Sequence, residues 1–255
     1  STIRIRTLIL LISLDNYKNQ LLEVGIKNAK NEIHWFLEKK FGFLKENIIF
    51  KKISLDDKQI EIFTDFFDRR IKKEPFQYIL NSAPFCDIDI YVNNYVLIPR
   101  PETETIINLL IKQNKRFSSA LDLCCGSGNL AIMLSLKKIA KNITAIDISN
   151  NALKVSKKNF KNFKLQNIHS LQLDFMNQKI NKQFDLIVCN PPYISNEEYS
   201  LLTSHVKDFE PRKALTDEKD GLSFYKKIHQ EIDDIVNLNG TILLEIGLEK
   251  HKSLI

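Results

Sequence analysis

Apolar residues recur at steps of three and four along the first third of the chain, which is the period of an amphipathic helix. Two such stripes are Ile33, Phe36, Leu37 and Phe41, and Ile60, Phe63, Phe67 and Ile71. Ser54 and Asp56 precede the second stripe, and a side-chain oxygen at this position can cap the first turn of its helix. We therefore expect residues 1–80 to form a small helical domain.

The pattern changes to short β-prone runs between Phe85 and Ile98. Asn93 and Asn94 lie within this stretch, and asparagine is favoured in the tight turns that join antiparallel strands. We expect a β-hairpin around these two residues, in a linker that spans residues 81–99.

Longer apolar runs alternate with helical stretches in the rest of the chain, residues 100–255. The expected strands are residues 120–124, 143–148, 170–173, 184–189 and 241–246. Runs that are apolar throughout are typical of parallel strands that are buried on both faces. The alternation predicts an α/β fold in which helices cover both faces of a parallel sheet through right-handed crossovers.

The composition is that of an ordinary globular protein, with 44% hydrophobic and 27% charged residues in 255. The longest apolar run, residues 8–12, is far shorter than the about 20 residues that cross a bilayer, so we expect no membrane association. The four cysteines show neither paired zinc spacing nor a disulfide framework, which favours the cytoplasm and predicts no metal site. The net charge of +6 permits nucleic-acid binding, but lysine is spread along the whole chain, so charge alone decides nothing.

Residues suited to a nucleotide-like cofactor follow the first three expected strands. Gly126 and Gly128 would let the backbone after the first strand approach a ligand closely. Asp147, at the end of the second strand, can accept both ribose hydroxyls of an adenosine. Asp174 can bind the adenine amino group, and Phe175 can stack on the base. The candidate cofactor-binding residues are Asp122, Cys124, Cys125, Gly126, Ser127, Gly128, Asp147, Asp174, Phe175 and Asn190.

The fourth expected strand ends in Asn190-Pro191-Pro192-Tyr193. Proline fixes φ and lacks an N–H donor, and the residue before it is held extended, so this strand end is stiff. The Asn190 side-chain oxygen and the Pro191 carbonyl can accept the two hydrogens of a planar NH₂ group, while Tyr193 packs on its face. We predict Asn190, Pro191 and Tyr193 as catalytic and all four residues as substrate-binding. NAD is the alternative cofactor, since Ala131 is tolerated at its third glycine position, but NAD gives this motif no role.

An amide or aryl-amine nitrogen is a weak nucleophile because its lone pair is delocalised. The sulfonium methyl of S-adenosylmethionine is already an activated electrophile, so such a nitrogen needs positioning more than it needs a strong base. Two acceptors that hold its hydrogens would fix it in line with the methyl group. The strand-end residues thus predict methyl transfer from S-adenosylmethionine to a planar amide or amino nitrogen.

With these motifs identified, the chain resembles the release factor glutamine methyltransferases, the HemK/PrmC family, over roughly residues 25–247. The most specific segment is Val96-Leu97-Ile98-Pro99-Arg100-Pro101-Glu102-Thr103-Glu104. The other matching segments are residues 74–79, 190–193, 208–211, 220–225 and 244–247. The chain departs from the family pattern with Cys124-Cys125 in place of Gly-Thr, and with Asn81 in place of a glycine. Asparagine tolerates positive φ better than most residues do.

The resemblance implies a Rossmann-like, S-adenosylmethionine-dependent methyltransferase sheet preceded by a small helical domain and a linking β-hairpin. It implies methylation of N5 of the glutamine in the Gly-Gly-Gln motif of class I peptide chain release factors, docked by the helical domain. We expect a monomer without a direct DNA substrate.

Two alternatives remain open at this point. A nucleic-acid amino methyltransferase would present the same NH₂ group at adenine N6, but it must flip the base and usually carries a recognition domain with a basic face. A non-catalytic ribosome- or RNA-binding module could keep the fold, although such a module does not require Asn190 or Tyr193.

Two further expectations concern the strand ends. Cys124 and Cys189 follow the first and fourth strands, which we expect to be neighbours, so the two thiols should lie close together and reduced. The fifth strand ends at Gly247 and the chain at Ile255, whereas methyltransferases of this architecture typically add a helix and an antiparallel strand pair. The sheet of the 100–255 domain therefore looks truncated, and we expect residues 241–246 to form an exposed edge.

Overall fold

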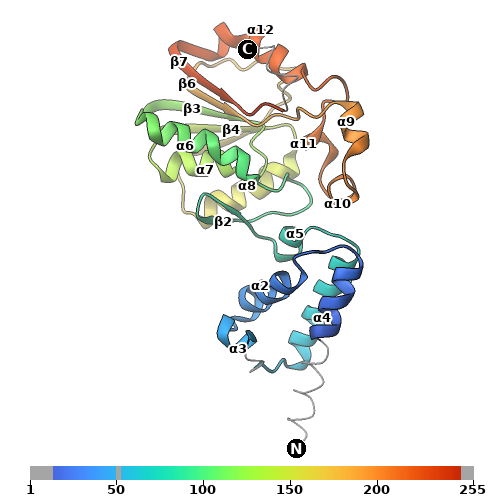
Figure 1. Cartoon of the computed structure of the whole chain (residues 1–255). Helices are drawn as coiled ribbons and strands as arrows, with labels where there is room; N and C mark the ends of the chain where they lie inside the picture. The colour runs from blue at the N-terminus through green and yellow to red at the C-terminus, as the bar shows by residue number, and fades with distance from the viewer. Residues whose placement is uncertain (1–13, 50–52, 248–255) are drawn as a thin grey trace, which may run out of the picture. The chain divides into compact units, whose positions relative to one another are not determined.

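The computed structural model describes residues 14–49 and 53–247, and the apolar run at residues 8–12 lies outside them. The chain divides into two compact units, Ser1–Asn81 and Ser82–Ile255. The first unit is helical, as the sequence predicts, and Figure 1 shows its helices in blue to teal. Its helices are residues 14–23, α2 (Ala29–Phe41), α3 (Lys45–Ile49), α4 (Asp57–Ile71) and α5 (Phe76–Leu80).

Aromatic packing forms the core of the first unit. The Phe36 ring of α2 stacks on the Phe66 ring of α4, with centroids 4.2 Å apart. Asp56 caps α4, because its carboxylate accepts the Gln59 N–H at 2.8 Å, which confirms the expected helix start. The expected stripe is only partly buried, since Ile60 in the first turn is 39% exposed.

One buried ion pair links α4 to α2 within the first unit. The Arg70 guanidinium donates to both oxygens of Glu32, at 2.6 and 3.2 Å.

Asn81 caps α5 in the left-handed conformation, with φ of 54°. The expectation that asparagine can take this glycine position is therefore confirmed.

The second unit begins with a hairpin of β1 (Ala83–Phe85) and β2 (Ile88–Ile90). Its turn lies at Cys86 and Asp87, whose φ angles of 45° and 66° are the positive values that a tight hairpin turn requires. The prediction of a hairpin is therefore confirmed, but its predicted position around Asn93 and Asn94 was wrong. The Asn93 side chain instead accepts the Tyr95 N–H at 3.1 Å, so its turn preference is expressed in a loop after the hairpin.

A five-stranded parallel sheet with the order β5-β4-β3-β6-β7 forms the centre of the second unit. Its strands are β3 (Phe117–Leu123), β4 (Ala140–Asp147), β5 (Ile168–Gln172), β6 (Phe184–Cys189) and β7 (Val236–Leu244). The helical segments of this unit are η1 (Pro101–Thr103), α6 (Glu104–Gln113), α7 (Asn129–Leu136), α8 (Asn150–Asn162), α9 (Asn196–Leu201), α10 (Ser204–Lys207), α11 (Arg212–Leu215) and α12 (Ser223–Ile235). The predicted α/β fold is confirmed.

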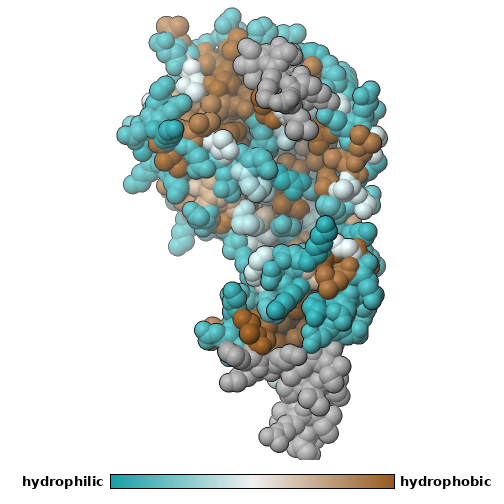
Figure 2. Space-filling view, viewed as in Figure 1, coloured by the Kyte–Doolittle hydropathy of each residue, from teal (hydrophilic) through white to brown (hydrophobic). Residues whose placement is uncertain are grey.

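The sheet is covered on both faces, with α6, α7 and α8 on one side and α12 on the other (Figure 1). The chain runs outward from β3 through β4 to β5 and then returns to β6 on the other side of β3. This reversal leaves a crevice at the carboxyl ends of the central strands, where open parallel sheets bind their ligands. Figure 2 shows hydrophilic residues over much of the visible face, with hydrophobic patches between them.

Candidate active site

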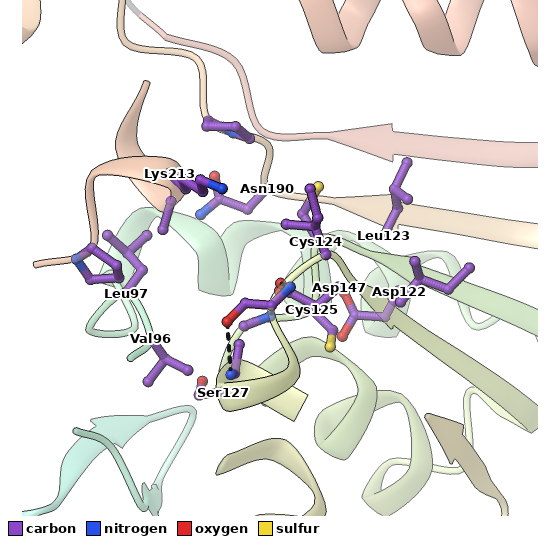
Figure 3. A pocket seen from close by; sticks show the side chains of 18 of the residues that line it. Val96, Leu97, Asp122, Leu123, Cys124, Cys125, Ser127, Asp147, Asn190 and Lys213 are labelled. Carbon is purple, nitrogen blue, oxygen red and sulfur yellow. Dashed lines mark hydrogen bonds between the residues drawn. The ribbon is translucent and has the colours of Figure 1, made fainter. Parts of the chain in front are cut away.

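A cavity of about 320 Å³ opens at the carboxyl ends of the central strands. This volume falls in the range of small-molecule sites, roughly 300–1,000 Å³. Figure 3 shows side chains from several strand ends and loops around it. Of the predicted site residues, Asp122, Cys124, Cys125, Gly126, Ser127, Asp147, Asp174, Phe175, Asn190 and Pro192 line the cavity. Gly128, Pro191 and Tyr193 are not among its lining residues.

The loop after β3 has three residues with positive φ. Cys124 has φ of 63°, Gly126 of 51° and Gly128 of 80°. The left-handed conformation at Cys124 matches the glycine that the family carries there, and it costs a non-glycine residue roughly 1–2 kcal/mol. A Cβ at Gly126 would meet nothing within 4 Å, so the backbone is open at this point of the cavity. A Cβ at Gly128 would lie 2.5 Å from the Phe160 ring, so this glycine allows α8 to pack closely.

Two carboxylates form one wall of the cavity. Asp122 is 1% exposed and accepts the Ala131 N–H at 2.9 Å. Burial, with the Asp147 carboxylate adding to it, raises the pKa of Asp122 to about 7. Asp147 accepts the N–H groups of Gly126 and Ser149 at 2.9 and 2.8 Å, and burial raises its pKa. A bound group with positive charge would favour the ionised form of both carboxyls.

Asp174 and Phe175, which follow β5, are placed differently from the expectation. Asp174 lines the cavity, but its carboxylate also accepts the Met176 N–H at 3.0 Å and the Asn177 amide at 2.8 Å. It therefore organises its own turn, and each oxygen keeps a further lone pair for a ligand. Phe175 is 3% exposed and packs in the core cluster of the sheet, so only a small part of its surface faces the cavity.

A fully buried asparagine, which no sequence pattern predicted as a site residue, holds the β3 loop in place. The Asn159 side chain donates to the carbonyls of Tyr91 and Ser127, both at 2.9 Å, and accepts the Tyr91 N–H at 2.9 Å. It thereby ties the loop to the segment that follows β2.

The Asn190–Tyr193 segment is held by hydrogen bonds to distant residues. The Asn190 amide donates to the Thr103 hydroxyl at 3.1 Å, and Thr103 donates to Glu245 at 2.6 Å. The Tyr193 hydroxyl donates to the other Glu245 oxygen at 3.0 Å. Pro191 is buried. Thr103 and Glu245 were not predicted as site residues, although they lie in the segments that carry the family resemblance.

Another ion pair supports the cavity wall. Arg100 donates to Glu210 at 2.5 Å, and the other oxygen of Glu210 accepts the Ile98 N–H at 3.3 Å. Glu210 is 5% exposed. The segments around residues 98–100 and 208–211, which both carry the family resemblance, are thus in contact in the folded chain.

The expected proximity of Cys124 and Cys189 is confirmed. Leu123 of β3 is the register partner of Cys189 of β6, so Cys124 directly follows the partner of Cys189. Interaction with the Cys189 thiol, together with burial, raises the pKa of Cys124. Both cysteines are free thiols in the structure.

The donor set fits S-adenosylmethionine. The open backbone at Gly126 gives room for a ligand, and Asp147 offers a partly buried acceptor beside it. Asp122 and Asp147 would favour the positive charge of a sulfonium, and Asn190 lies at the neighbouring strand end. When bound, this cofactor supplies an activated methyl group.

Two family models match the chain. One, described as the methyltransferase small domain, matches residues 102–210, and the other, described as the PrmC N-terminal domain, matches residues 13–80. The fold and site together therefore define an S-adenosylmethionine-dependent methyltransferase.

Curated relatives place the chain within this class. It is 36% identical over 78% of its length to a release factor glutamine methyltransferase from Thermodesulfovibrio yellowstonii, of which it covers 73%. It is 34% identical over 89% of its length to the enzyme of that name from Clostridium acetobutylicum, of which it covers 81%. With the corresponding protein of Geobacter sulfurreducens the figures are 29%, 95% and 85%. The chain belongs to the release factor glutamine methyltransferase family.

In residues 14–49 and 53–247, no helix is long and apolar enough to cross a bilayer. The same part of the chain contains no group of three or more His, Cys, Asp or Glu side chains placed to hold a metal ion.

Proposed function

We propose that this protein transfers a methyl group from S-adenosylmethionine to N5 of the glutamine in the Gly-Gly-Gln motif of class I peptide chain release factors. The observation that carries the proposal is the Asn190 amide, which lines the cofactor-sized cavity and is anchored from behind by Thr103. The names of the relatives support a release factor glutamine as the acceptor, and the family resemblance adds the Gly-Gly-Gln motif and the N5 atom.

The residues of this chain would act by binding and alignment. Asp147 and the open backbone at Gly126 would hold the adenosine part of the cofactor. The Asn190 side-chain oxygen and the Pro191 carbonyl would accept the two hydrogens of the glutamine amide, and Tyr193 would border its plane. Fixing the nitrogen in line with the methyl group supplies most of the acceleration in such a site.

The test is transfer of a labelled methyl group to purified release factor. We expect label on wild-type release factor and none on a variant in which the motif glutamine is replaced by asparagine, which has a shorter side chain. Asn190→Ala should lower the rate by about 100-fold or more, equivalent to about 3 kcal/mol, while cofactor affinity measured by calorimetry stays within a few-fold.

A duplex DNA containing unmodified adenine serves as the competing substrate in the same assay. Label on the DNA, with none on the release factor, would favour a nucleic-acid amino methyltransferase. Absence of label on both, with cofactor still bound, would contradict the proposed substrate. Near wild-type transfer by Asn190→Ala would contradict the role of the strand end.

A further inference from the structure

A hydrogen-bonded relay lies behind the Asn190 amide and joins three separate parts of the second unit. Asn190 follows β6, Thr103 ends η1, and Glu245 follows β7. The Thr103 oxygen lies 3.1 Å from the Asn190 amide nitrogen and 2.6 Å from one Glu245 oxygen. The other Glu245 oxygen lies 3.0 Å from the Tyr193 hydroxyl. One carboxylate therefore holds both polar side chains of the strand end.

The chemistry of these groups fixes the direction of each bond. An ionised carboxylate only accepts hydrogen bonds, so Thr103 must give its single hydroxyl hydrogen to Glu245. The Thr103 oxygen can then only accept, and within the Asn190 amide only the NH₂ end can donate to it. Thr103 is 2% exposed, so bulk water does not compete for this bond. The amide is thus held with its NH₂ end against Thr103.

The Glu245 backbone is fixed from two sides. Its N–H donates to the Cys189 carbonyl at 2.9 Å, directly before Asn190. Its carbonyl accepts the Tyr225 hydroxyl of α12 at 2.8 Å. Burial and the Glu245 carboxylate raise the pKa of Tyr193, so the phenol stays protonated and remains a donor at neutral pH.

We propose that Thr103 and Glu245 are positioning residues that set which end of the Asn190 amide meets the methyl acceptor. Their relay turns the Asn190 oxygen away from Thr103 and leaves it free to accept a hydrogen from an NH₂ group. In the reversed orientation, the amide NH₂ would face the acceptor NH₂, and two donors cannot bond to each other. This inference rests on the proposed function in one respect, namely that the acceptor is an NH₂ group.

The first experiment compares three threonine variants in single-turnover methyl transfer. Thr103→Val keeps the shape but removes the hydroxyl, so we expect the rate to fall at least tenfold, with cofactor affinity within about threefold of wild type. Thr103→Ser restores the hydroxyl and should recover the rate to within a few-fold. Thr144→Val, in β4 and outside the relay, is the matched control and should keep the wild-type rate.

A double-mutant cycle separates positioning from a general structural effect. If Thr103 acts through the Asn190 amide, Thr103→Val should cause no further loss of rate in an Asn190→Ala background. A structural role would lower the residual rate again. Additive losses, or a Thr103→Val enzyme with the wild-type rate, would overturn the inference.

A final measurement needs no methyl acceptor, so it tests the relay even if the substrate assignment fails. The Tyr193 phenol is titrated by absorbance, as the difference between the protein and its Tyr193→Phe variant, in the wild-type and Glu245→Gln backgrounds. Removing the anionic partner should let Tyr193 ionise at a lower pH. An unchanged Tyr193 titration would overturn the role of Glu245, whereas a failure to methylate release factor would overturn only the proposed substrate.

Discussion

Gly221 packs against the backbone at Tyr193 and Ser195 more closely than a residue with a Cβ could. Its φ is +80°, and a Cβ built on it would lie 2.2 Å from the Tyr193 carbonyl oxygen and 3.2 Å from the Ser195 nitrogen. Ordinary contacts of a Cβ begin at 3.4 Å, so Gly221→Ala must displace one of the two backbone segments by about 1 Å. Neither neighbour is a flexible side chain that could move aside.

The expected cost of Gly221→Ala has two parts. Left-handed φ costs an alanine about 1 kcal/mol, and accommodating an added group in a packed site costs about 1–3 kcal/mol. We therefore expect a loss of about 2–4 kcal/mol in the free energy of unfolding of the second unit. A displacement of about 1 Å at residues that align a reaction can lower its rate on the order of 100-fold, and we expect this loss of methyl transfer in the variant that remains folded.

Gly42 provides a control that isolates the φ contribution. It has φ of +72° and nothing within 4 Å of an added Cβ. Asparagine tolerates this conformation, so Gly42→Asn should be nearly neutral, whereas Gly42→Ala should cost about 1 kcal/mol. At position 221, asparagine should do no better than alanine, because the clash comes from the Cβ itself. Denaturant unfolding and methyl-transfer rates would measure both series. A Gly221→Asn enzyme with wild-type stability and rate would refute the steric argument.

Three further predictions concern the cavity wall. Asp147→Ala should weaken cofactor binding at least about tenfold in calorimetry, because two ribose hydroxyls lose a charged acceptor; unchanged affinity would make Asp147 only a strand-end cap. Burial raises the pKa of Asp122 from 3.8 to about 7, so ionisation of this group opposes folding increasingly between pH 4 and 7. Without cofactor, the free energy of unfolding of Asp122→Asn should therefore gain on that of wild type by up to about 1.4 kcal/mol per pH unit in that window. A gain that does not depend on pH would contradict this. Intact-mass analysis without reductant should show all four cysteines, including Cys124 and Cys189, as thiols, and a loss of two hydrogens would contradict this.

The elements of the sheet could be predicted because their signals are local. Except for Asp185, residues 184–189 are apolar in sequence and buried in β6. The hairpin could not be placed in the same way, because its turn at Cys86 and Asp87 carries no glycine or asparagine. The backbone there has positive φ because the geometry of the two strands requires it, and not because its residues prefer it.

The residues of the candidate site also differ in whether a local sequence signal predicts them. Asp147 and Asn190 could be predicted because each directly follows an apolar run whose end must lie at the ligand edge of a parallel sheet. The partners of Asn190 could not, because Thr103 and Glu245 are 142 positions apart and meet only through a side-chain hydrogen bond. Gly128 was predicted for the right local reason, a demand on backbone space, but the space is filled by Phe160.

The last prediction concerns the edge of the sheet. Among the described strands, β7 pairs with β6 alone, and Leu238 lies where this pairing is irregular, between Val236 and Thr241, with 94% of its surface exposed. An apolar strand edge with unpaired backbone groups is a template for association, and lysine on such an edge opposes it. We expect wild-type protein to self-associate as its concentration rises, and Leu238→Lys to reduce this in sedimentation velocity. Leu201→Lys, at an 83% exposed position in α9 away from the edge, should not.

Bound cofactor should raise the stability of the folded protein by mass action. A ligand that binds only the folded state stabilises it by RT ln(1 + [L]/Kd), which is about 2.7 kcal/mol at a hundredfold excess over Kd. S-adenosylmethionine should therefore raise the melting temperature of wild-type and Leu238→Lys protein equally, because Leu238 does not line the cavity. If Leu201→Lys reduced association as much as Leu238→Lys, general surface hydrophobicity would explain the effect and the β7 edge would not.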